Sequence, residues 1–237
     1  MPTILITGAN QGLGLEFTRQ YAADGWHIIA CCRSPESAEA LTNLASGDGE
    51  VTIEQLDVRD HAAIEALGKK YAGVPLDILL NNAGIIGPVP IADNIQRQHF
   101  GSMDYEVWRD VFETNTFAPV KLAEVFIDNL AAGGQKKLVN ISSNVSSIAE
   151  MTIPAIAYAS SKTALNRAMT IIAEQLKERG IIVAMFCPGY VKTRMDAFGY
   201  AMVEIEQSIS ALRPLIASLT IEDTGSFRNF EGRTIGW

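Results

Sequence analysis

The chain has 237 residues, 48% of them hydrophobic, which is enough apolar material for one large α/β core. Its 19 basic and 27 acidic side chains give a formal net charge of −8. The largest clusters of basic residues in the sequence are the pairs Lys69-Lys70 and Lys136-Lys137. Neither nucleic acid nor an anionic membrane surface is therefore expected as a partner.

The cysteines and the apolar runs indicate in which cellular compartment the protein is expected. Cys31, Cys32 and Cys187 are odd in number and lack metal-ligand spacing, which argues against a disulfide framework and a zinc site. The first residues lack the features of a secretory signal, and no apolar run approaches the ~18 residues of a membrane span. We therefore expect no metal site, and a reducing cytoplasm as the location.

The first segment reads strand, glycine-rich turn, helix. The apolar run Thr3–Thr7 is typical of a buried strand, and a helix is expected over residues 15–23. Glycines between them permit a tight turn and a close approach of backbone to phosphate, and the free N–H groups of the helix favour a pyrophosphate. A plain turn is the alternative. Nucleotide contacts are expected from Gly8, Asn10, Gln11, Gly12, Leu13 and Gly14.

The second strand, residues 27–33, ends in a basic residue. In a dinucleotide-binding fold an acidic residue near this point holds the ribose 2′-hydroxyl, and none is present here. Arg33 can instead meet a 2′-phosphate, which favours NADP over NAD. An exposed arginine at a strand end is the alternative.

The third strand is expected over residues 51–57, after a polar helix near 36–45. Asp57 and Val58 follow at its end, where an adenine can lie. Asp57 could also cap the helix expected from about residue 60 to 71, and the two roles are compatible.

The fourth strand, residues 76–80, ends in small residues that suit a cleft in a parallel sheet, Asn81-Asn-Ala-Gly84. The stretch 85–103 is broken by Pro and Gly without a clear period, which predicts a long loop over the mouth of the site. A helix follows over 105–131, bent at Pro119. It contains Asn115, although asparagine is a poor former of helix interiors.

The fifth strand, residues 137–141, delivers Ser142 and Ser143. Side chains alternate along a strand, so one of the two serines faces the site, and we favour Ser143. A sixth strand (181–187), an amphipathic helix (202–219) and a short strand within 225–232 follow. The repeated strand–helix units predict one doubly wound domain over 1–237, with about seven mainly parallel strands and helices on both faces. Its dinucleotide half spans about 1–84 and its catalytic half about 85–237.

A further helix begins near Tyr158-Ala-Ser-Ser-Lys162. Four residues of spacing put Tyr158 and Lys162 on one helix face. A phenol with a pKa near ~10 is a weak base at neutral pH, and a neighbouring ammonium lowers that pKa. The spacing alone is common, and its plainer interpretation is a tyrosine packed over a lysine stem.

The ordered set of motifs resembles the short-chain dehydrogenase/reductase family, in its shorter, classical branch. It comprises Thr7-Gly-x-x-x-Gly-x-Gly14, Asn81-Asn-Ala-Gly84, Asn115, Ser142/Ser143, Tyr158-x-x-x-Lys162 and Pro188-Gly189 with Thr193. The glycine-rich turn and the tail Phe227-x-x-x-x-Gly232-x-x-x-x-Trp237 further resemble the C-factor-like members.

The resemblance implies a Rossmann-type fold and a role for each matched position. Tyr158 would donate or accept the proton of the substrate oxygen, and Lys162 would lower its pKa and hold the nicotinamide ribose. Ser143 would hydrogen-bond the substrate oxygen, and Asn115 would support a water that links Lys162 to solvent. The remaining cofactor contacts would come from Asn82, Ala83, Gly84, Pro188, Gly189, Val191 and Thr193.

The resulting hypothesis is an NADP(H)-dependent oxidoreductase that interconverts a carbonyl and an alcohol. Many NADP-preferring relatives carry a basic residue where Gln11 stands, so Arg33 is the main support for NADP. One alternative is a nucleotide-binding signalling protein on the same fold. Another is a sugar-nucleotide epimerase, which the glycine spacing disfavours. A small-molecule substrate is expected, and a homodimer or homotetramer is compatible with the family.

Overall fold

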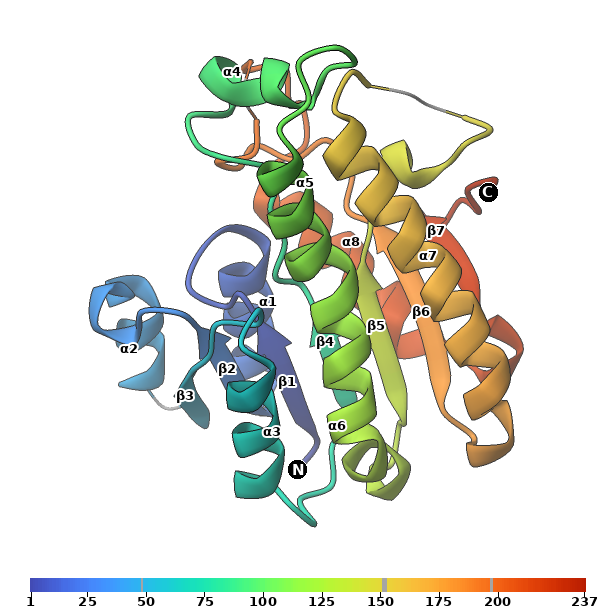
Figure 1. The fold of residues 1–237 in the computed structure, drawn as a ribbon. Coiled ribbons are helices and arrows are strands. Elements are labelled where there is room, and N and C mark those ends of the chain that lie inside the picture. The colour runs from blue at the N-terminus through green and yellow to red at the C-terminus, as the bar shows by residue number, and fades with distance from the viewer. Residues whose placement is uncertain (48, 151–152, 197) are drawn as a thin grey trace.

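The computed structural model describes residues 1–47, 49–150, 153–196 and 198–237, which form a sheet with helices on both faces (Figure 1). Over these residues the sheet has seven strands in the order β3-β2-β1-β4-β5-β6-β7. Each neighbouring pair is parallel. The strands are β1 (Thr3–Thr7), β2 (His27–Cys32), β3 (Val51–Gln55), β4 (Ile78–Asn81), β5 (Lys137–Ile141), β6 (Ile182–Cys187) and β7 (Ser226–Asn229).

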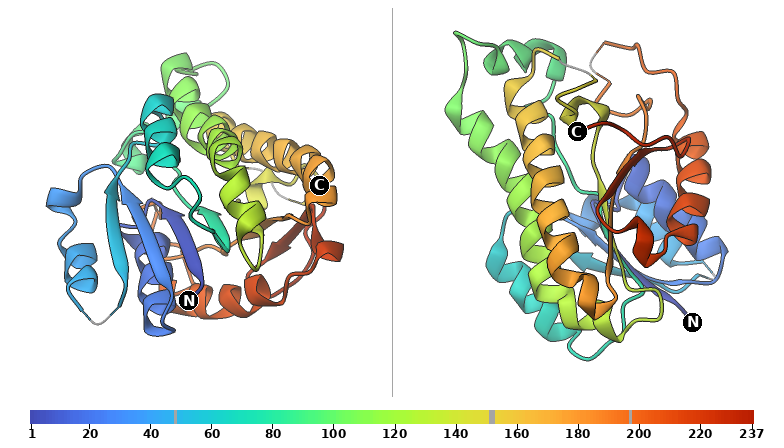
Figure 2. Two further views of the ribbon diagram at one scale, coloured as in Figure 1. Left: turned by 90° about the horizontal axis from the view of Figure 1, so that it is seen from below. Right: turned by 90° about the vertical axis from the view of Figure 1, so that its right-hand side faces the viewer.

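The helices form one layer on each side of the sheet (Figure 2). Helices α3, α6 and α7 pack on one face, and α1, α2 and α8 pack on the other. No helix in the described ranges is both long enough and apolar enough to cross a membrane. The helix bounds are α1 (Gly12–Ala23), α2 (Glu39–Ala45), α3 (His61–Lys70), α4 (Ile91–Asn94), α5 (Tyr105–Phe112), α6 (Ala118–Ala132), α7 (Ile156–Leu176) and α8 (Ile205–Ser218).

The core lies on both faces of the sheet, because successive strand side chains point to opposite sides. Leu5 and Leu79 belong to the cluster beneath α3, α6 and α7. Ile4 and Leu80 belong to the cluster beneath α1, α2 and α8. The doubly wound parallel sheet predicted from the sequence is confirmed.

The helix predicted over 105–131 is divided. A π-helical turn, Glu113–Phe117, separates α5 from α6, and Pro119 is the second residue of α6. The bend expected at Pro119 stays a prediction. Pro119 has no backbone N–H, so an α-helical bond from residue 119 to the Asn115 carbonyl cannot form. The wider turn buries Thr114, Asn115 and Thr116 together.

The stretch 85–103 is not a plain loop. It contains α4 and a 3-10 segment, Ile95–Gln98, which are too short to show a helical period in the sequence. One capping alternative is also settled. Asp60, not Asp57, accepts the Ala63 N–H that caps α3, at 3.0 Å.

Candidate active site

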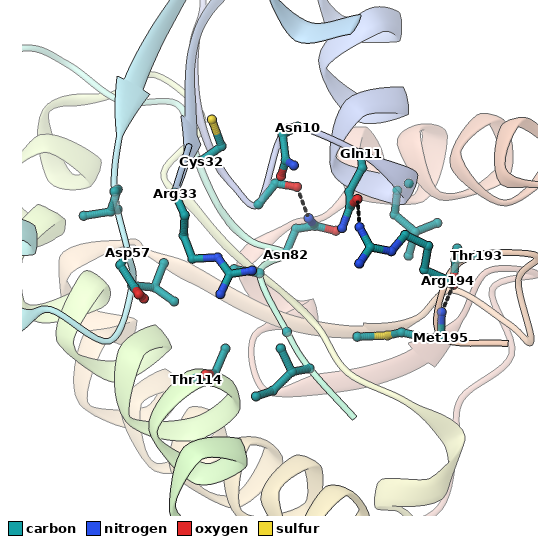
Figure 3. A pocket seen from close by; sticks show the side chains of 18 of the residues that line it. Asn10, Gln11, Cys32, Arg33, Asp57, Asn82, Thr114, Thr193, Arg194 and Met195 are labelled. Atoms are coloured by element: carbon teal, nitrogen blue, oxygen red, sulfur yellow. Dashed lines mark hydrogen bonds between the residues drawn. The ribbon is translucent and has the colours of Figure 1, made fainter. Parts of the chain in front are cut away.

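The carboxyl ends of the strands meet at the edge of the sheet opposite the N-terminus (Figure 1). The strand order reverses between β1 and β4, and such a switch point opens a crevice in a parallel sheet. A pocket of about 230 Å³ lies there (Figure 3). The predicted nucleotide residues that line it are Gly8, Asn10, Gln11, Gly12, Leu13, Arg33, Asp57, Val58, Asn82, Ala83, Gly84 and Thr193.

The glycine-rich turn is closed tightly against the end of β4. A Cβ atom on Gly14 would lie 2.2 Å from the Gly8 carbonyl oxygen and 2.6 Å from Asn82 Nδ2, so only glycine fits. The Asn82 amide donates to the carbonyl oxygens of Thr7 and Gly8, at 2.9 and 3.2 Å. Helix α1 then begins at Gly12, with its free N–H groups at the pocket. This cradle fits a dinucleotide pyrophosphate.

Three arginines reach this pocket, and sequence reasoning identified only Arg33. Arg59 forms an ion pair with Asp57, with 2.8 Å between Nη2 and Oδ2. The hydrogen bond from Arg59 and, more weakly, the charge of Arg33 lower the pKa of Asp57. Arg194 donates from Nη1 to Gln11 Oε1 at 2.7 Å. No local motif marks Arg59 or Arg194 as pocket residues.

The Ser143 hydroxyl lies beside the Tyr158 phenol and lowers its pKa. Burial has the larger effect, and the pKa of Tyr158 is raised to about 12. In this state of the protein burial therefore favours the neutral phenol. The expectation that Lys162 lowers the pKa of Tyr158 stays a prediction.

Lys162 lies in a buried position one helical turn beyond Tyr158. Its ammonium donates to the Ile141 carbonyl oxygen, at the end of β5, with a distance of 2.8 Å. Burial lowers the pKa of Lys162 to about 8. A Cβ atom on Gly84 would lie 3.4 Å from Lys162 Nζ and 3.3 Å from Asn115 Oδ1. Both side chains thus flank the end of the nucleotide pocket.

Asn115 is fully buried and holds two other segments together. Its side chain accepts from the Ile85 N–H at 2.9 Å and donates to the Ile85 carbonyl oxygen at 2.8 Å. It also donates to Ser161 Oγ at 3.0 Å, on helix α7. Asn115 therefore ties the end of β4 to the helix that carries Tyr158.

The two serines after β5 have different surroundings, as their alternation predicts. Ser142 is buried, with its hydroxyl 3.3 Å from Ser146 Oγ, whereas Ser143 contacts Tyr158. The remaining predicted cofactor residues do not line the pocket. Val191 is buried in a bridge to Val203, and Pro188 and Gly189 form the turn that precedes it.

Gln98 is a site residue that sequence reasoning missed. Its amide is buried, donates to the Ile86 carbonyl oxygen at 2.6 Å and accepts from the Tyr158 N–H at 3.1 Å. The N-cap of α7, Ala155, offers no side-chain bond, so Gln98 satisfies one of the free N–H groups of that helix. Its only sequence signal is a polar residue in an otherwise irregular stretch.

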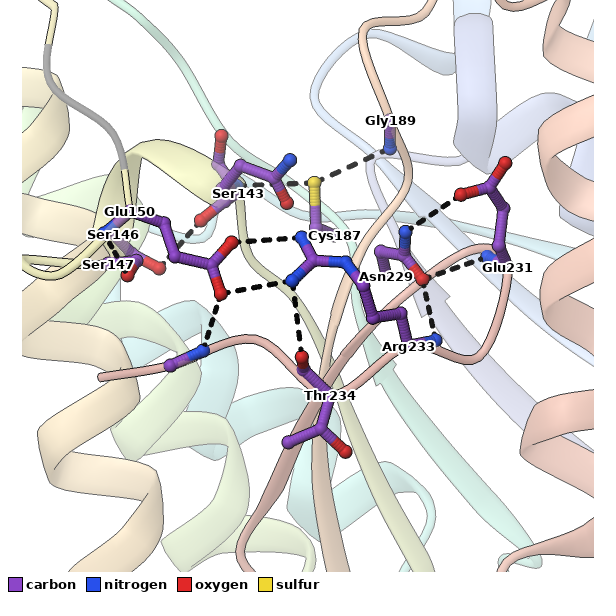
Figure 4. Close-up of polar contacts among 12 residues, drawn as sticks. Ser143, Ser146, Ser147, Glu150, Cys187, Gly189, Asn229, Glu231, Arg233 and Thr234 are labelled. Atoms are coloured by element: carbon purple, nitrogen blue, oxygen red, sulfur yellow. Dashed lines mark hydrogen bonds and ion pairs between the residues drawn. The ribbon is translucent and has the colours of Figure 1, made fainter.

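The end of the chain closes over the segment that follows Ser143 (Figure 4). Arg233 donates to both carboxylate oxygens of Glu150, at 3.0 and 2.9 Å, and the Gly236 N–H donates to the same carboxylate at 2.8 Å. Nearby, the buried Cys187 thiol accepts from the Asn144 and Gly189 N–H groups, at 3.2 and 3.4 Å.

Residues 2–202 match the family model of the short chain dehydrogenases. The chain belongs to this family and is one of its oxidoreductases. It is 33% identical to the protein FixR of Bradyrhizobium diazoefficiens over 196 residues, which cover 81% of this chain and 68% of FixR. It is 28% identical to the uncharacterized oxidoreductase C663.06c of Schizosaccharomyces pombe, over 97% of this chain and 96% of that protein.

Solved structures of this family share the whole fold. The NADPH-bound carbonyl reductase from chicken fatty liver is 30% identical, with a TM-score of 0.89, over 100% of this chain and 99% of the reductase. The carbonyl reductase Sniffer of Drosophila melanogaster is 28% identical, with a TM-score of 0.90, over 100% of both chains. The membership expected from the ordered motifs is confirmed, while the C-factor-like subgroup stays a prediction.

Proposed function

We propose that this oxidoreductase interconverts an aldehyde or ketone and the corresponding alcohol with NADP(H), and that Tyr158 transfers the proton. The observation that carries the proposal is the position of buried Lys162, one helical turn from Tyr158. Its ammonium donates to the end of the strand that precedes Ser143 and lies beside Gly84 of the nucleotide pocket. The NADPH-bound carbonyl reductase among the similar structures supports the same reaction class.

The residues of the pocket suit the proposed cofactor. The turn around Gly14 leaves backbone N–H groups for the pyrophosphate, and Asp57 and Val58 form the wall for the adenine end. Arg33 extends into the pocket from the end of β2 and would meet the 2′-phosphate (Figure 3). The nicotinamide, when bound, supplies or accepts the hydride.

Proton transfer is assigned to the side chains around Tyr158. In the direction of reduction, the Tyr158 hydroxyl gives its proton to the substrate oxygen, and its raised pKa keeps it protonated at neutral pH. Ser143 would hydrogen-bond the same oxygen and stabilise the charge that develops on it. Lys162, with a pKa of about 8, carries a proton at pH 7 and favours the phenolate left behind.

Two measurements test this proposal. Fluorescence titration of the purified protein should give a lower Kd for NADPH than for NADH, and Arg33→Gln should weaken NADPH binding far more than NADH binding. An equal loss for both would remove the 2′-phosphate role of Arg33.

The catalytic role is tested with a panel of aldehydes and ketones, followed through the consumption of NADPH. Tyr158→Phe should lower kcat by about 10²–10⁴-fold, the usual contribution of a general acid, with cofactor binding near normal. Turnover retained by this variant would refute the assignment. A partner or phenotype that survives Tyr158→Phe but is lost when the Gly12–Gly14 turn is disrupted would instead favour the signalling alternative.

A further inference from the structure

The nucleotide pocket contains cationic charge that the protein itself leaves unneutralised. Of its three arginines, Arg59 is paired with Asp57. Within the described residues, neither Arg33 nor Arg194 forms an ion pair with a carboxylate. The protein as a whole is acidic, with a formal net charge of −8, yet two exposed guanidinium groups without a carboxylate partner line one pocket, where they would attract an anionic ligand.

The two unpaired arginines enter the pocket from opposite sides (Figure 3). Arg33 follows β2 and lies on the side of Asp57, near the expected adenine end. Arg194 comes from the segment after β6 and reaches across to Gln11, the N-cap of α1, at 2.7 Å. The glycine-rich turn and the segment that carries Arg194 therefore face each other across the space that a dinucleotide would fill.

The position of Arg194 also places it near the start of α1. The Thr193 methyl group lies 3.9 Å from the point that a Cβ on Gly12, the first residue of α1, would occupy. The N-terminus of a helix carries partial positive charge, which an adjacent guanidinium reinforces. The current partner of Arg194 is a neutral amide, which an anion can replace at small cost because charge-assisted hydrogen bonds are stronger.

We propose that Arg194 binds a phosphate group of the dinucleotide and closes the cleft over it, by exchanging its contact with Gln11 for phosphate oxygens. The inference rests on the proposed function, because it presupposes a dinucleotide in this pocket. Two groups of the dinucleotide have phosphate oxygens that could accept from Arg194. The pyrophosphate is present in both NADH and NADPH, and the 2′-phosphate is present in NADPH alone.

The test is a comparison of Kd values for NADH and NADPH, measured on the wild type and on Arg194→Gln. Loss of a hydrogen-bonded charge should weaken binding by about 10- to 100-fold. A similar loss for both dinucleotides identifies the pyrophosphate, and a loss confined to NADPH identifies the 2′-phosphate. Unchanged Kd values for both would overturn the inference.

Two further variants separate a direct contact from a general effect of charge. Lys192→Gln removes the same charge two residues away, where the lysine pairs with Glu204, and should leave both Kd values nearly unchanged. The double variant Gln11→Arg with Arg194→Gln returns a guanidinium to the same corner and should recover most of the affinity. A loss in Lys192→Gln equal to that in Arg194→Gln would refute a specific contact.

Failure of this inference is distinguishable from failure of the proposed function. If the wild-type protein binds neither dinucleotide, the proposed function fails. If the wild type binds and Arg194→Gln binds equally well, the proposed function stands and the role of Arg194 is excluded. Raising the salt concentration adds a check, because screening should weaken binding more in the wild type than in Arg194→Gln.

Discussion

Arg233 and Glu150 form a bidentate ion pair that joins the C-terminal tail to the segment following Ser143, across 83 positions of sequence. The carboxylate also accepts the Gly236 N–H, and the Glu150 N–H donates to Ser147 Oγ at 3.0 Å. One charged pair thereby joins the end of the chain to the segment 147–150 that follows β5. It belongs to the scaffold of Ser143 rather than to the nucleotide pocket.

Removing this pair should slow turnover without weakening cofactor binding. Glu150→Gln and Arg233→Gln are each expected to lower kcat several-fold, because the loop that positions Ser143 loses its anchor, while the Kd for NADPH stays unchanged. Steady-state kinetics and cofactor titration give the two readouts. The control is Arg228→Gln, which breaks a neighbouring pair with Asp223 that does not touch this loop. Equal effects of Arg228→Gln and Arg233→Gln on kcat would contradict the positioning role.

The same pair should contribute to acid stability. The hydrogen bonds from Arg233 lower the pKa of Glu150 from 4.5 to about 2. A lowered carboxyl pKa stabilises the fold above the unfolded value, and this contribution is lost as the pH falls from 4.5 towards 2. Glu150→Gln should lose less stability than the wild type in that window, as measured by urea unfolding at several pH values. If the free energy of unfolding falls equally with pH in Glu150→Gln and in the wild type, the ion pair makes no contribution to acid stability.

Lys162 is expected to cost stability at neutral pH. Its pKa is about 8 in the folded chain and 10.5 ordinarily, so between these values the unfolded state binds more protons and the free energy of unfolding rises with pH. Lys162→Met should be more stable than the wild type below pH 8, by at most about 3 kcal/mol, and this difference should shrink towards pH 10.5.

Denaturant unfolding across this pH range checks the sign and the window. Lys177→Met, at an exposed lysine, is the matched control, and its free energy of unfolding should change with pH as that of the wild type does. A difference between Lys162→Met and the wild type that does not vary with pH would show that lost packing, rather than the buried charge, is responsible. Turnover by Lys162→Met should be low at every pH.

Gln98 is expected to act on turnover through the start of α7. Gln98→Leu keeps the approximate volume but leaves the Tyr158 N–H and the Ile86 carbonyl without their partner. Loss of a helix cap costs about 0.5–2 kcal/mol, and kcat should fall because Tyr158 is no longer held in place. Thermal unfolding and kinetics are measured together. The control is Gln96→Leu, which alters an exposed glutamine of the same segment and should change neither the melting temperature nor kcat. Similar losses of stability and kcat in both variants would contradict the role of Gln98.

Gly14 should tolerate no side chain. Gly14→Ala places a Cβ 2.2 Å from the Gly8 carbonyl oxygen, and such overpacking costs about 1–3 kcal/mol and displaces the turn. NADPH binding should be lost even where the variant remains folded, as shown by circular dichroism. Gly47→Ala, whose Cβ would lie 3.4 Å from its nearest neighbour, is the control. Normal NADPH binding by Gly14→Ala would refute the cradle.

Part of this architecture was predictable because it depends on residues close together in the sequence. Apolar runs identified the strands, and the glycine spacing identified the turn before α1. The four-residue spacing of Tyr158 and Lys162 placed both on α7. These features were predictable because strand and helix periodicity act within a few residues. The single-domain reading and the oligomeric state stay predictions.

Other features were decided by contacts between distant segments. The π-helical turn at Asn115 forms where its side chain binds Ile85 and Ser161, which lie far from it in sequence. Burial, which no local pattern measures, raises the pKa of Tyr158 and lowers that of Lys162.

The contact of Arg194 with Gln11 spans 183 positions. The sequence by itself determined the strands, the turn and the placement of Tyr158 and Lys162 on one helix, because each depends on local spacing. The tertiary structure alone decided which charges face one another across the pocket, because that depends on how the strand ends converge.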